Sequence, residues 1–399
     1  MHVSRRAFRT PSSPIRKLYC LAEAAEKRGL EVYHLNIGQS DLPTPQEFYD
    51  EIGNFSKKTL SYAPSTGYTE TIKAWQKYFH DFGISFQENQ IIVTMGASEA
   101  LLFAFVAVAD YEEEIIVFEP LYPNYLSFAS MVDVRLRPVT LNIKNSYHLP
   151  PAAKIQEFVN KKTRAILVNN PSNPTGAVYT REELQDVIDL AEKNDLYIIA
   201  DETYREVIFG KNKFISIMDF PQAKSRTIVV DSVSKRFNLC GARIGCLASQ
   251  NQEIISSVTK FAQGRLSAPT IEQLGVAPLL ADSKKFTDKL KTEYQRRMQT
   301  VAQALSQIKG VKYGHPEGAF YLTVELPVND AEEFCRWLLE KFQYENSTVM
   351  LAPGNGFYVT EGMGKKEVRI AYVLESKKLE MAMQILKKAL EEFNKKLTI

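Results

Sequence analysis

The hydrophobic and polar positions of this chain follow different patterns before and after about residue 275. In the first part, short continuous apolar runs alternate with longer segments of helical periodicity. A run without polar alternation is typical of a strand that is buried on both faces, as in parallel sheets covered by helices. The expected strands are residues 90–94, 114–118, 164–169, 196–200 and 227–230. We therefore predict an α/β fold with a mostly parallel central sheet sandwiched by helices.

Helix signals occur at three places in this first part. Ser13 is followed by a proline, which is typical of an N-cap and a first helical residue, so we expect a helix that ends near Gly29. Another helix is expected from Thr180. The strongly apolar segment 100–109 is half the length that a bilayer span needs, which favours a buried helix.

The second part begins with a long, charged, amphipathic helix from Ser283 toward Lys309. Two strands, 318–325 and 367–373, and a helix from Lys377 follow it. This order predicts a smaller α+β domain. Because no long Gly/Ser linker separates the two parts, we expect them to pack closely and to share a cleft.

Charge and cysteine content narrow the classes of function. The 49 Lys and Arg residues nearly balance the 47 Asp and Glu residues, so the net charge of +2 indicates neither a nucleic-acid nor a membrane-surface partner. The four cysteines have neither metal-ligand spacing nor the density of a disulfide framework, which indicates a reducing cytoplasm and no metal site. The N-terminal arginines precede no apolar core, so we expect no secretory signal or anchor.

Three reactive side chains follow predicted strands. Asp201 and Tyr204 come after the strand 196–200, and Lys235 comes after the strand at 227–230. Open α/β sheets place their ligands at the carboxyl ends of strands. Pyridoxal phosphate needs an amine for its aldehyde, a carboxylate at its ring nitrogen and a hydroxyl near its phenolic oxygen, and these residues supply one of each.

Two segments could hold a phosphate group. Gly96, Ala97 and Ser98 join a strand to a helix, where free N–H groups and the positive end of the helix favour an anion, although such a turn is more often plain structure. Near Lys235, the hydroxyls of Ser232 and Ser234 and the planar guanidinium of Arg243 make a more specific set of donors.

Three further residues have both a structural and a functional interpretation. Asn173 lies in an Asn/Pro/Gly cluster that forms a turn in any case, but its amide could donate to a cofactor or substrate oxygen. Tyr122 follows a strand and could stack on a ring or simply pack in the core. Arg369 lies among apolar strand residues and needs either a structural salt bridge or a substrate carboxylate.

Together these residues resemble the class I/II, aspartate-aminotransferase-like aminotransferases, which are pyridoxal-phosphate enzymes of fold type I. The likeness extends over essentially the whole chain. The stretches that carry it are 35–45 (Leu-Asn-Ile-Gly-Gln-Ser-Asp-Leu-Pro-Thr-Pro), 62–67 (Tyr-Ala-Pro-Ser-Thr-Gly), 169–176 (Asn-Asn-Pro-Ser-Asn-Pro-Thr-Gly), 201–204 (Asp-Glu-Thr-Tyr), 232–235 (Ser-Val-Ser-Lys) with Arg243, and Arg369.

The resemblance implies that pyridoxal 5'-phosphate binds with Lys235 as its Schiff-base anchor and Asp201 at its ring nitrogen. Tyr204 and Asn173 would hydrogen-bond its phenolic oxygen, and Tyr122 would stack on its ring. The expected phosphate-binding residues are Gly96, Ala97, Ser98, Ser232, Ser234 and Arg243.

The resemblance also implies a homodimer with shared active sites, because Tyr62 would reach the phosphate in the neighbouring subunit. Arg369, Asn173 and the backbone of Gly38 would bind the substrate α-carboxylate. Arg265 lies where some members read the substrate side chain from the partner's loop, so it is a candidate for binding an acidic side chain.

The resemblance further implies a division of the chain into two domains. The large cofactor-binding domain would comprise residues 46–294. Residues 1–45 and 295–399 would form the small, mobile α+β domain.

The expected activity is transfer of an amino group from an L-amino acid to a 2-oxo acid by a ping-pong mechanism, and aspartate and glutamate are the candidate substrates. A carbon–sulfur β-lyase or another lyase with the same cofactor is the nearest alternative, since the cofactor motifs do not separate these reactions. A remote alternative is an α/β-hydrolase whose triad would be Ser98, Asp201 and His315. A cofactor-sensing regulatory domain is not expected, because too few residues precede the first helix for an added DNA-binding module.

Overall fold

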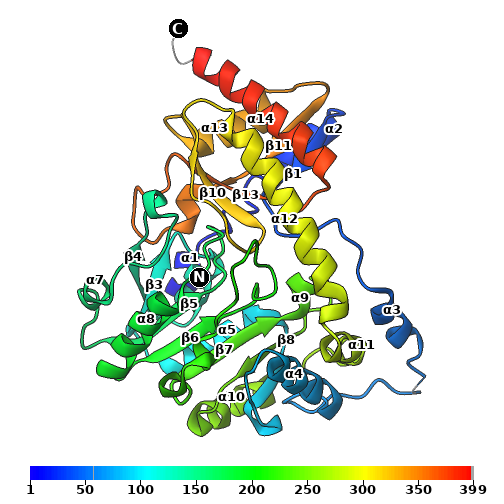
Figure 1. Cartoon of the computed structure of the whole chain (residues 1–399), viewed down its shortest axis with the longest axis vertical. Coiled ribbons are helices and arrows are strands. Elements are labelled where there is room, and N and C mark those ends of the chain that lie inside the picture. The colour runs from blue at the N-terminus through cyan, green and yellow to red at the C-terminus, as the bar shows by residue number, and fades with distance from the viewer. Residues whose placement is uncertain (57, 397–399) are drawn as a thin grey trace.

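A seven-stranded sheet forms the base of the computed structural model, which describes residues 1–56 and 58–396 (Figure 1). From one edge to the other its strands are β2 (Ile91–Thr94), β8 (Gly245–Ala248), β7 (Thr227–Ser232), β6 (Tyr197–Asp201), β5 (Thr163–Asn169), β3 (Glu114–Glu119) and β4 (Arg135–Thr140). Only β8 is antiparallel to its neighbours in this sheet. The predicted mostly parallel sheet is confirmed.

Helices cover both faces of this sheet, as its unbroken apolar strands require. On β3, Ile115 and Val117 belong to one buried cluster, whereas Ile116 between them belongs to the cluster on the opposite face. The helices packed on the first face are α5 (Gly96–Val108), α6 (Asn124–Met131) and α10 (Gln252–Arg265). On the second face lie α7 (Ala152–Gln156) and α8 (Arg181–Lys193). Around the β2 edge lie α3 (Gln46–Gly53), α4 (Thr69–Asp81) and α11 (Thr270–Ala281).

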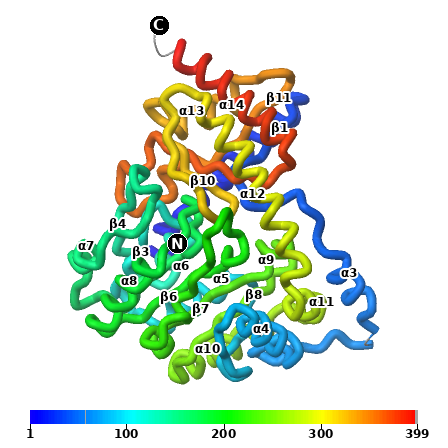
Figure 2. Tube along the Cα trace, in the orientation of Figure 1, coloured from blue at the N-terminus to red at the C-terminus, as the bar shows by residue number. Residues whose placement is uncertain are grey.

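A second group of elements stands above the large sheet (Figures 1 and 2). It contains an antiparallel sheet in the order β12 (Ala352–Pro353), β13 (Glu367–Ala371), β10 (Tyr321–Glu325), β9 (Lys312–Tyr313), and a parallel pair β1 (Glu31–His34) and β11 (Ser347–Met350). Its helices are α2 (Tyr19–Lys27), α13 (Ala331–Glu340) and α14 (Ser376–Lys396), and α12 (Lys284–Ser306) reaches it from the large sheet.

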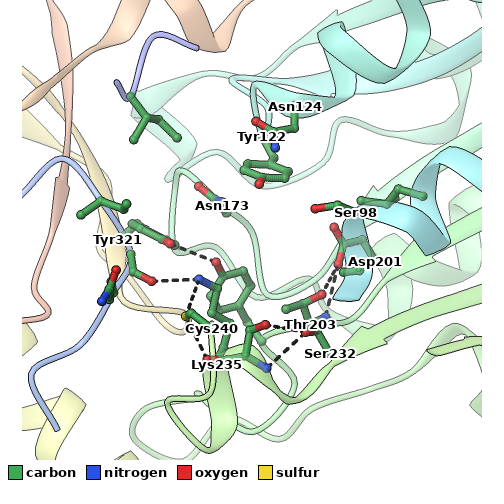
Figure 3. Close-up of a pocket in the computed structure, with 18 of the residues that line it drawn as sticks. Ser98, Tyr122, Asn124, Asn173, Asp201, Thr203, Ser232, Lys235, Cys240 and Tyr321 are labelled. Carbon is green, nitrogen blue, oxygen red and sulfur yellow. Dashed lines mark hydrogen bonds between the residues drawn. The ribbon is translucent and has the colours of Figure 1, made fainter. Parts of the chain in front are cut away.

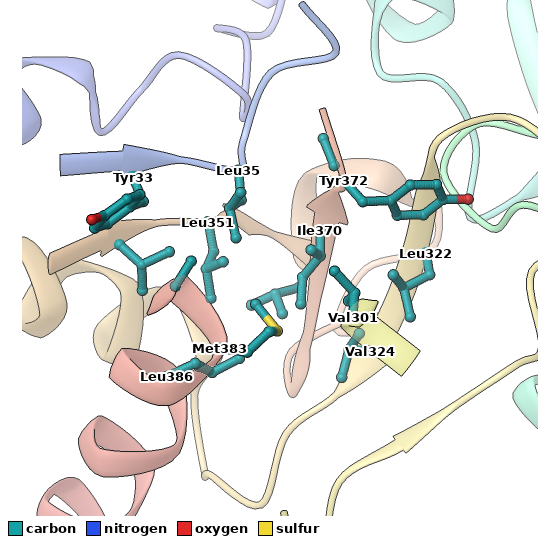
Figure 4. Packing of buried hydrophobic residues seen from close by; sticks show 14 of the residues in the cluster. Tyr33, Leu35, Val301, Leu322, Val324, Leu351, Ile370, Tyr372, Met383 and Leu386 are labelled. Carbon is teal, nitrogen blue, oxygen red and sulfur yellow. The ribbon is translucent and has the colours of Figure 1, made fainter. Parts of the chain in front are cut away.

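One buried cluster joins the two ends of the chain in this upper group (Figure 4). Tyr33 and Leu35 from the N-terminal part pack with Leu351, Ile370 and Met383 from the C-terminal part. The parallel pairing of β1 with β11 makes the same connection through the backbone. The domain boundaries at 45/46 and 294/295 stay predictions, and the second of them falls inside α12.

The first predicted helix begins later than expected. Residues 14–18 form turns, and α2 starts at Tyr19 with Leu18 as its N-cap. A regular helix from Ser13 would use the carbonyl of Ile15 as an acceptor for the Tyr19 N–H. Here the side-chain amide of Asn36 donates to that carbonyl at 2.8 Å, and the Tyr19 N–H donates to Arg16 instead. A long-range contact therefore overrides the local capping signal.

The apolar segment at 100–109 lies largely within α5, which packs on the large sheet as expected. No helix within residues 1–56 and 58–396 combines the length and the apolar character that a bilayer crossing needs.

His148 links the large sheet region to the smaller one. Its Nδ1 lies 3.0 Å from a carboxylate oxygen of Glu183 at the start of α8, and its Nε2 lies 3.2 Å from Glu317, which precedes β10. The hydrogen bonds to Glu183 and Glu317 raise the pKa of His148 to about 10, although burial opposes them. The imidazolium thus bridges two carboxylates from different parts of the fold.

We expect His148→Gln to destabilise the protein in a pH-dependent way. Because the folded pKa is raised, the stability that this group contributes is complete below its unfolded pKa of about 6.5 and is lost as the pH rises toward about 10. Urea unfolding should show a larger deficit at about pH 6 than at about pH 10. His80→Gln, at an exposed position at the end of α4, is the control and should show no such trend. An equal deficit for His148→Gln at both pH values would contradict the assignment.

Candidate active site

A cavity of about 620 Å³ lies between the large sheet and the smaller group of elements. Its floor is formed where β5, β6 and β7 end, at Asn169, Asp201 and Ser232. Its other wall carries Tyr321 from β10 and Arg369 from β13. The carboxyl ends of the parallel strands therefore meet the smaller sheet across one cavity, as the sequence predicted.

The carboxylate of Asp201 is held on both oxygens. The hydroxyl of Tyr125 donates to Oδ2 at 2.6 Å, and the hydroxyl of Thr203 donates to Oδ1 at 2.7 Å. Burial raises the pKa of Asp201, and the two hydroxyl hydrogen bonds partly offset this by favouring the charged form. These contacts fix the direction in which the carboxylate meets a ligand; Figure 3 shows Asp201 with Thr203 beside it.

Lys235 extends from the short helix α9 (Val233–Arg236) at the end of β7. Its Nζ donates to the carbonyl of Gly38 at 2.8 Å and lies 3.7 Å from Cys240 Sγ. Burial lowers the pKa of this amine, but the neighbouring Tyr321 and Cys240 raise it by more, so the pKa is above its ordinary value. The amine reaches the cavity from the large sheet and contacts the N-terminal segment at Gly38. Figure 3 shows Lys235 in the cavity.

The expected phosphate-binding groups converge at the start of α5. Ala97, Ser98, Ser232, Ser234 and Arg243 all line the cavity. The Ser232 hydroxyl donates to Ser234 Oγ at 2.8 Å, and Arg243 donates to the carbonyls of Cys240 and Met95. The first N–H groups of α5 have no acceptor within the helix, so they are free to bind an anion.

Gly96 is required beneath this group of donors. Its φ of +74° lies in the left-handed region, and a Cβ atom there would come within 2.5 Å of the Arg243 guanidinium. The glycine therefore lets the helix start and the arginine approach each other closely.

Arg369 is the cation at the other end of the cavity, and it is almost completely buried at 1% exposure. It donates to Asn173 Oδ1 at 3.0 Å and to the carbonyl of Asn36, and its guanidinium lies over the ring of Tyr321. Its Nε has no hydrogen-bond partner, and it forms no ion pair within the described part of the chain. The alternative of a structural salt bridge is therefore wrong, and burial lowers the pKa of a charge that lacks its anion.

Two aromatic residues shape the space between these ends. Tyr122 lies across the cavity from Lys235 (Figure 3); it is half-buried, and desolvation raises the pKa of its hydroxyl. The hydroxyl of Tyr204 is 3.0 Å from that of Tyr321. The backbone of Gly38 passes so close to Tyr321 that a Cβ there would overlap the tyrosine hydroxyl.

Four residues named from the sequence do not line this cavity, and one of them, Gly96, lies directly before the lining residues Ala97 and Ser98. Tyr62 is 77% exposed. Arg265 is the last residue of α10 rather than part of the following loop; it donates to the carbonyls of Ser65 and Val93 and lies 3.2 Å from a Glu99 oxygen. His315 lines a separate depression, so the hydrolase triad is not assembled. The roles of Tyr62 and Arg265 toward a second subunit stay predictions.

The sequence interpretation missed several residues that complete the site. Thr203 could have been found, because it lies two residues after Asp201 and short hydroxyl side chains commonly bond an aspartate at that spacing. No local signal in the sequence marked Tyr125, Tyr321, Asn36 or Cys240. The first three contact site residues that lie far from them along the chain.

A buried group of charges lies behind the strand ends. Asp231, next to Ser232, accepts from Arg236 and lies 3.3 Å from Arg205, which also pairs with Glu202 at 2.6 Å. All four side chains are buried. Burial raises the pKa of Glu202 to about 7. This buried charge cluster joins the segment after β6 to the segment after β7.

We expect Gly96→Ala to weaken cofactor binding. The added methyl group would displace the Arg243 guanidinium and force a left-handed backbone onto alanine, at a cost of about 1–2 kcal/mol, or roughly tenfold in affinity for the pyridoxal phosphate that the sequence resemblance implies. A spectrophotometric titration of the cofactor-free protein measures this affinity. Gly53→Ala is the control, because it ends α3 with open space around it. Unchanged affinity in Gly96→Ala would show that this turn does not hold the phosphate.

Comparisons with known proteins agree with this geometry. The family model of aminotransferase class I and II matches residues 31–386. The aspartate aminotransferase of Pyrococcus horikoshii is 31% identical over 98% of this chain and 97% of its own, and aromatic-amino-acid aminotransferase 2 of Thermococcus litoralis is 29% identical over 98% and 99%. The crystal structure of the Thermotoga maritima aspartate aminotransferase superposes with a TM-score of 0.89 at 29% identity, over 98% of this chain and all of that one. The chain belongs to the class I and II aminotransferases.

Proposed function

We propose that this aminotransferase uses pyridoxal 5'-phosphate to move an amino group from an L-amino acid to a 2-oxo acid in two half-reactions. The observation that carries the proposal is the placement of Lys235, Asp201 and Arg369 in one cavity. These residues are an amine, a buried carboxylate and a buried cation without an anion. Membership of the aminotransferase family supports the transfer of an amino group. The use of an L-amino acid as donor and a 2-oxo acid as acceptor is proposed for this chain.

The residues present fit the cofactor. Asp201, with both oxygens ordered by hydroxyls, suits a protonated ring nitrogen, and Lys235 suits an aldehyde carbon. Tyr122 offers a flat face to a ring, and Tyr204 and Asn173 offer polar groups for a ring oxygen. Gly96 allows Arg243 to lie close to the start of α5, and this guanidinium together with the first N–H groups of the helix suits a phosphate.

When bound, pyridoxal phosphate supplies an electrophilic carbon for the amino group and an electron sink for the substrate Cα. Asn173 and Asn36 hold two guanidinium nitrogens of Arg369 in place, and the planar guanidinium suits a carboxylate. This contact would fix the orientation of the substrate. Lys235 Nζ is the amine in the cavity that can take the Cα proton and return it, which is the role of a general base and acid.

A homodimer with shared active sites is part of this proposal. Tyr62 and Leu60 are exposed at 77% and 57%, and they precede Thr66, whose carbonyl accepts from the Val93 N–H of β2 at 2.8 Å. A second copy would bury these side chains and bring Tyr62 to the neighbouring cavity. The four free cysteines are consistent with a reducing cytoplasm.

Lys235→Ala should reduce transamination of aspartate with 2-oxoglutarate on the order of 10³-fold, because the base is removed. Borohydride should fix the cofactor covalently to Lys235 in the unchanged protein and not in this variant. Lys213→Ala, at an exposed loop position, is the control and should keep full activity.

Full activity of Lys235→Ala, or borohydride labelling of another residue, would refute the mechanism. Release of pyruvate and ammonia from cystathionine without a 2-oxo acid acceptor would favour the β-lyase instead. Initial rates at several concentrations of both substrates should give the parallel double-reciprocal lines of ping-pong kinetics.

A further inference from the structure

The cavity is lined by four cationic side chains and a single anionic one. Lys235, Arg243 and Arg369 each have a role in the proposed function, toward an aldehyde, a phosphate and an α-carboxylate. Asp201 is the anion, and it is assigned to the ring nitrogen. The remaining cation is Arg16, which is exposed and forms no ion pair in the part of the chain that the structure describes.

Arg16 lies on a segment that is fixed to the smaller sheet region. The carbonyl of Ile15 accepts from the side-chain amide of Asn36 at 2.8 Å. Pro14 packs against Gly356, where a Cβ atom would come within 2.2 Å of the proline ring. Lys17 forms an ion pair with Glu332 at the start of α13. The backbone that carries Arg16 is therefore anchored on both sides of this residue.

Asn36 connects this segment directly to Arg369. Its side chain donates to Ile15, while its backbone carbonyl accepts from the Arg369 guanidinium. One buried residue thus sets the position of both cationic groups relative to each other. Ile15 and Ile37 also line the cavity and offer apolar surface for the methylene groups of a substrate.

Within this chain, Arg265 is less suited than Arg16 to bind a carboxylate of a substrate in the cavity. Two backbone carbonyls and Glu99 already contact its guanidinium, and it lies outside the lining of the cavity. A substrate carboxylate would have to displace Glu99, whereas at Arg16 it would meet a cation with no competing carboxylate.

We propose that Arg16 binds the distal carboxylate of a dicarboxylic amino acid or 2-oxo acid whose α-carboxylate is held by Arg369. The inference rests on the proposed function and names the substrate class that the cavity selects. Arg369 would hold the α-carboxylate and Arg16 the distal carboxylate, and Asn36 contacts both Arg369 and the segment that carries Arg16. Arg16 would not strengthen the binding of substrates that lack the second carboxylate.

Arg16→Gln should lower kcat/KM for aspartate and 2-oxoglutarate by about 10- to 100-fold, because charge-assisted hydrogen bonds to a carboxylate are lost. The kcat/KM for alanine and pyruvate should change by less than about threefold, since these substrates lack the distal group. Arg16→Lys, which keeps the charge and loses the planar fork, should fall between the two. Arg5→Gln removes an exposed arginine from the same N-terminal region and should change neither substrate class.

Calorimetric titration of the cofactor-loaded protein gives a readout that needs no turnover. Succinate should bind Arg16→Gln about 10- to 100-fold more weakly than the unchanged protein, and propionate, with one carboxylate, should bind both equally. Equal losses for both substrate classes, or unchanged succinate affinity, would overturn the assignment of Arg16. If Lys235→Ala kept its activity, the proposed mechanism would fail while the succinate result would still decide the role of Arg16.

Discussion

The buried charge cluster of Glu202, Arg205, Asp231 and Arg236 is the constraint on which the active site depends. It connects the carboxyl ends of β6 and β7 and the segments that follow them. These parts of the chain carry Asp201, Tyr204, Ser232, Ser234 and Lys235. Charges inside a protein are stable only when they are paired, and removal of one partner from such a pair costs about 3–5 kcal/mol. The cluster therefore holds the two strand ends in one relative position.

Tyr321 is the corresponding centre on the smaller sheet. It contacts Gly38, bonds the hydroxyl of Tyr204 and lies under the guanidinium of Arg369. Gly38 in turn accepts a hydrogen bond from Lys235. The contacts that join the two sheets across the cavity are therefore made through residues proposed to bind the cofactor and the substrate. A shift of the smaller sheet would move these binding residues as well.

The charges in the cavity are arranged for an anionic ligand. Arg369 is buried without an anion, and its guanidinium is held by amide and carbonyl oxygens rather than by a carboxylate. Such a group has already lost its hydration in the folded protein, so a carboxylate meets directed donors at little further cost. Asp201 is the counterpart of opposite sign, with a direction fixed by Tyr125 and Thr203.

The amino-acid sequence by itself determined the central parallel strands β3, β5, β6 and β7, five of the longer helices and the residues with reactive groups, because apolar runs and unusual polar residues are local signals. It did not identify β4, an edge strand with alternating polar residues, or the four-residue strand β8. Only the tertiary structure decided that α2 begins at Tyr19, that Tyr125 orients Asp201, and that Asn36 joins the segment of Arg16 to Arg369. These contacts join residues far apart along the chain, and no local pattern of the sequence specifies which distant group satisfies a buried donor or acceptor.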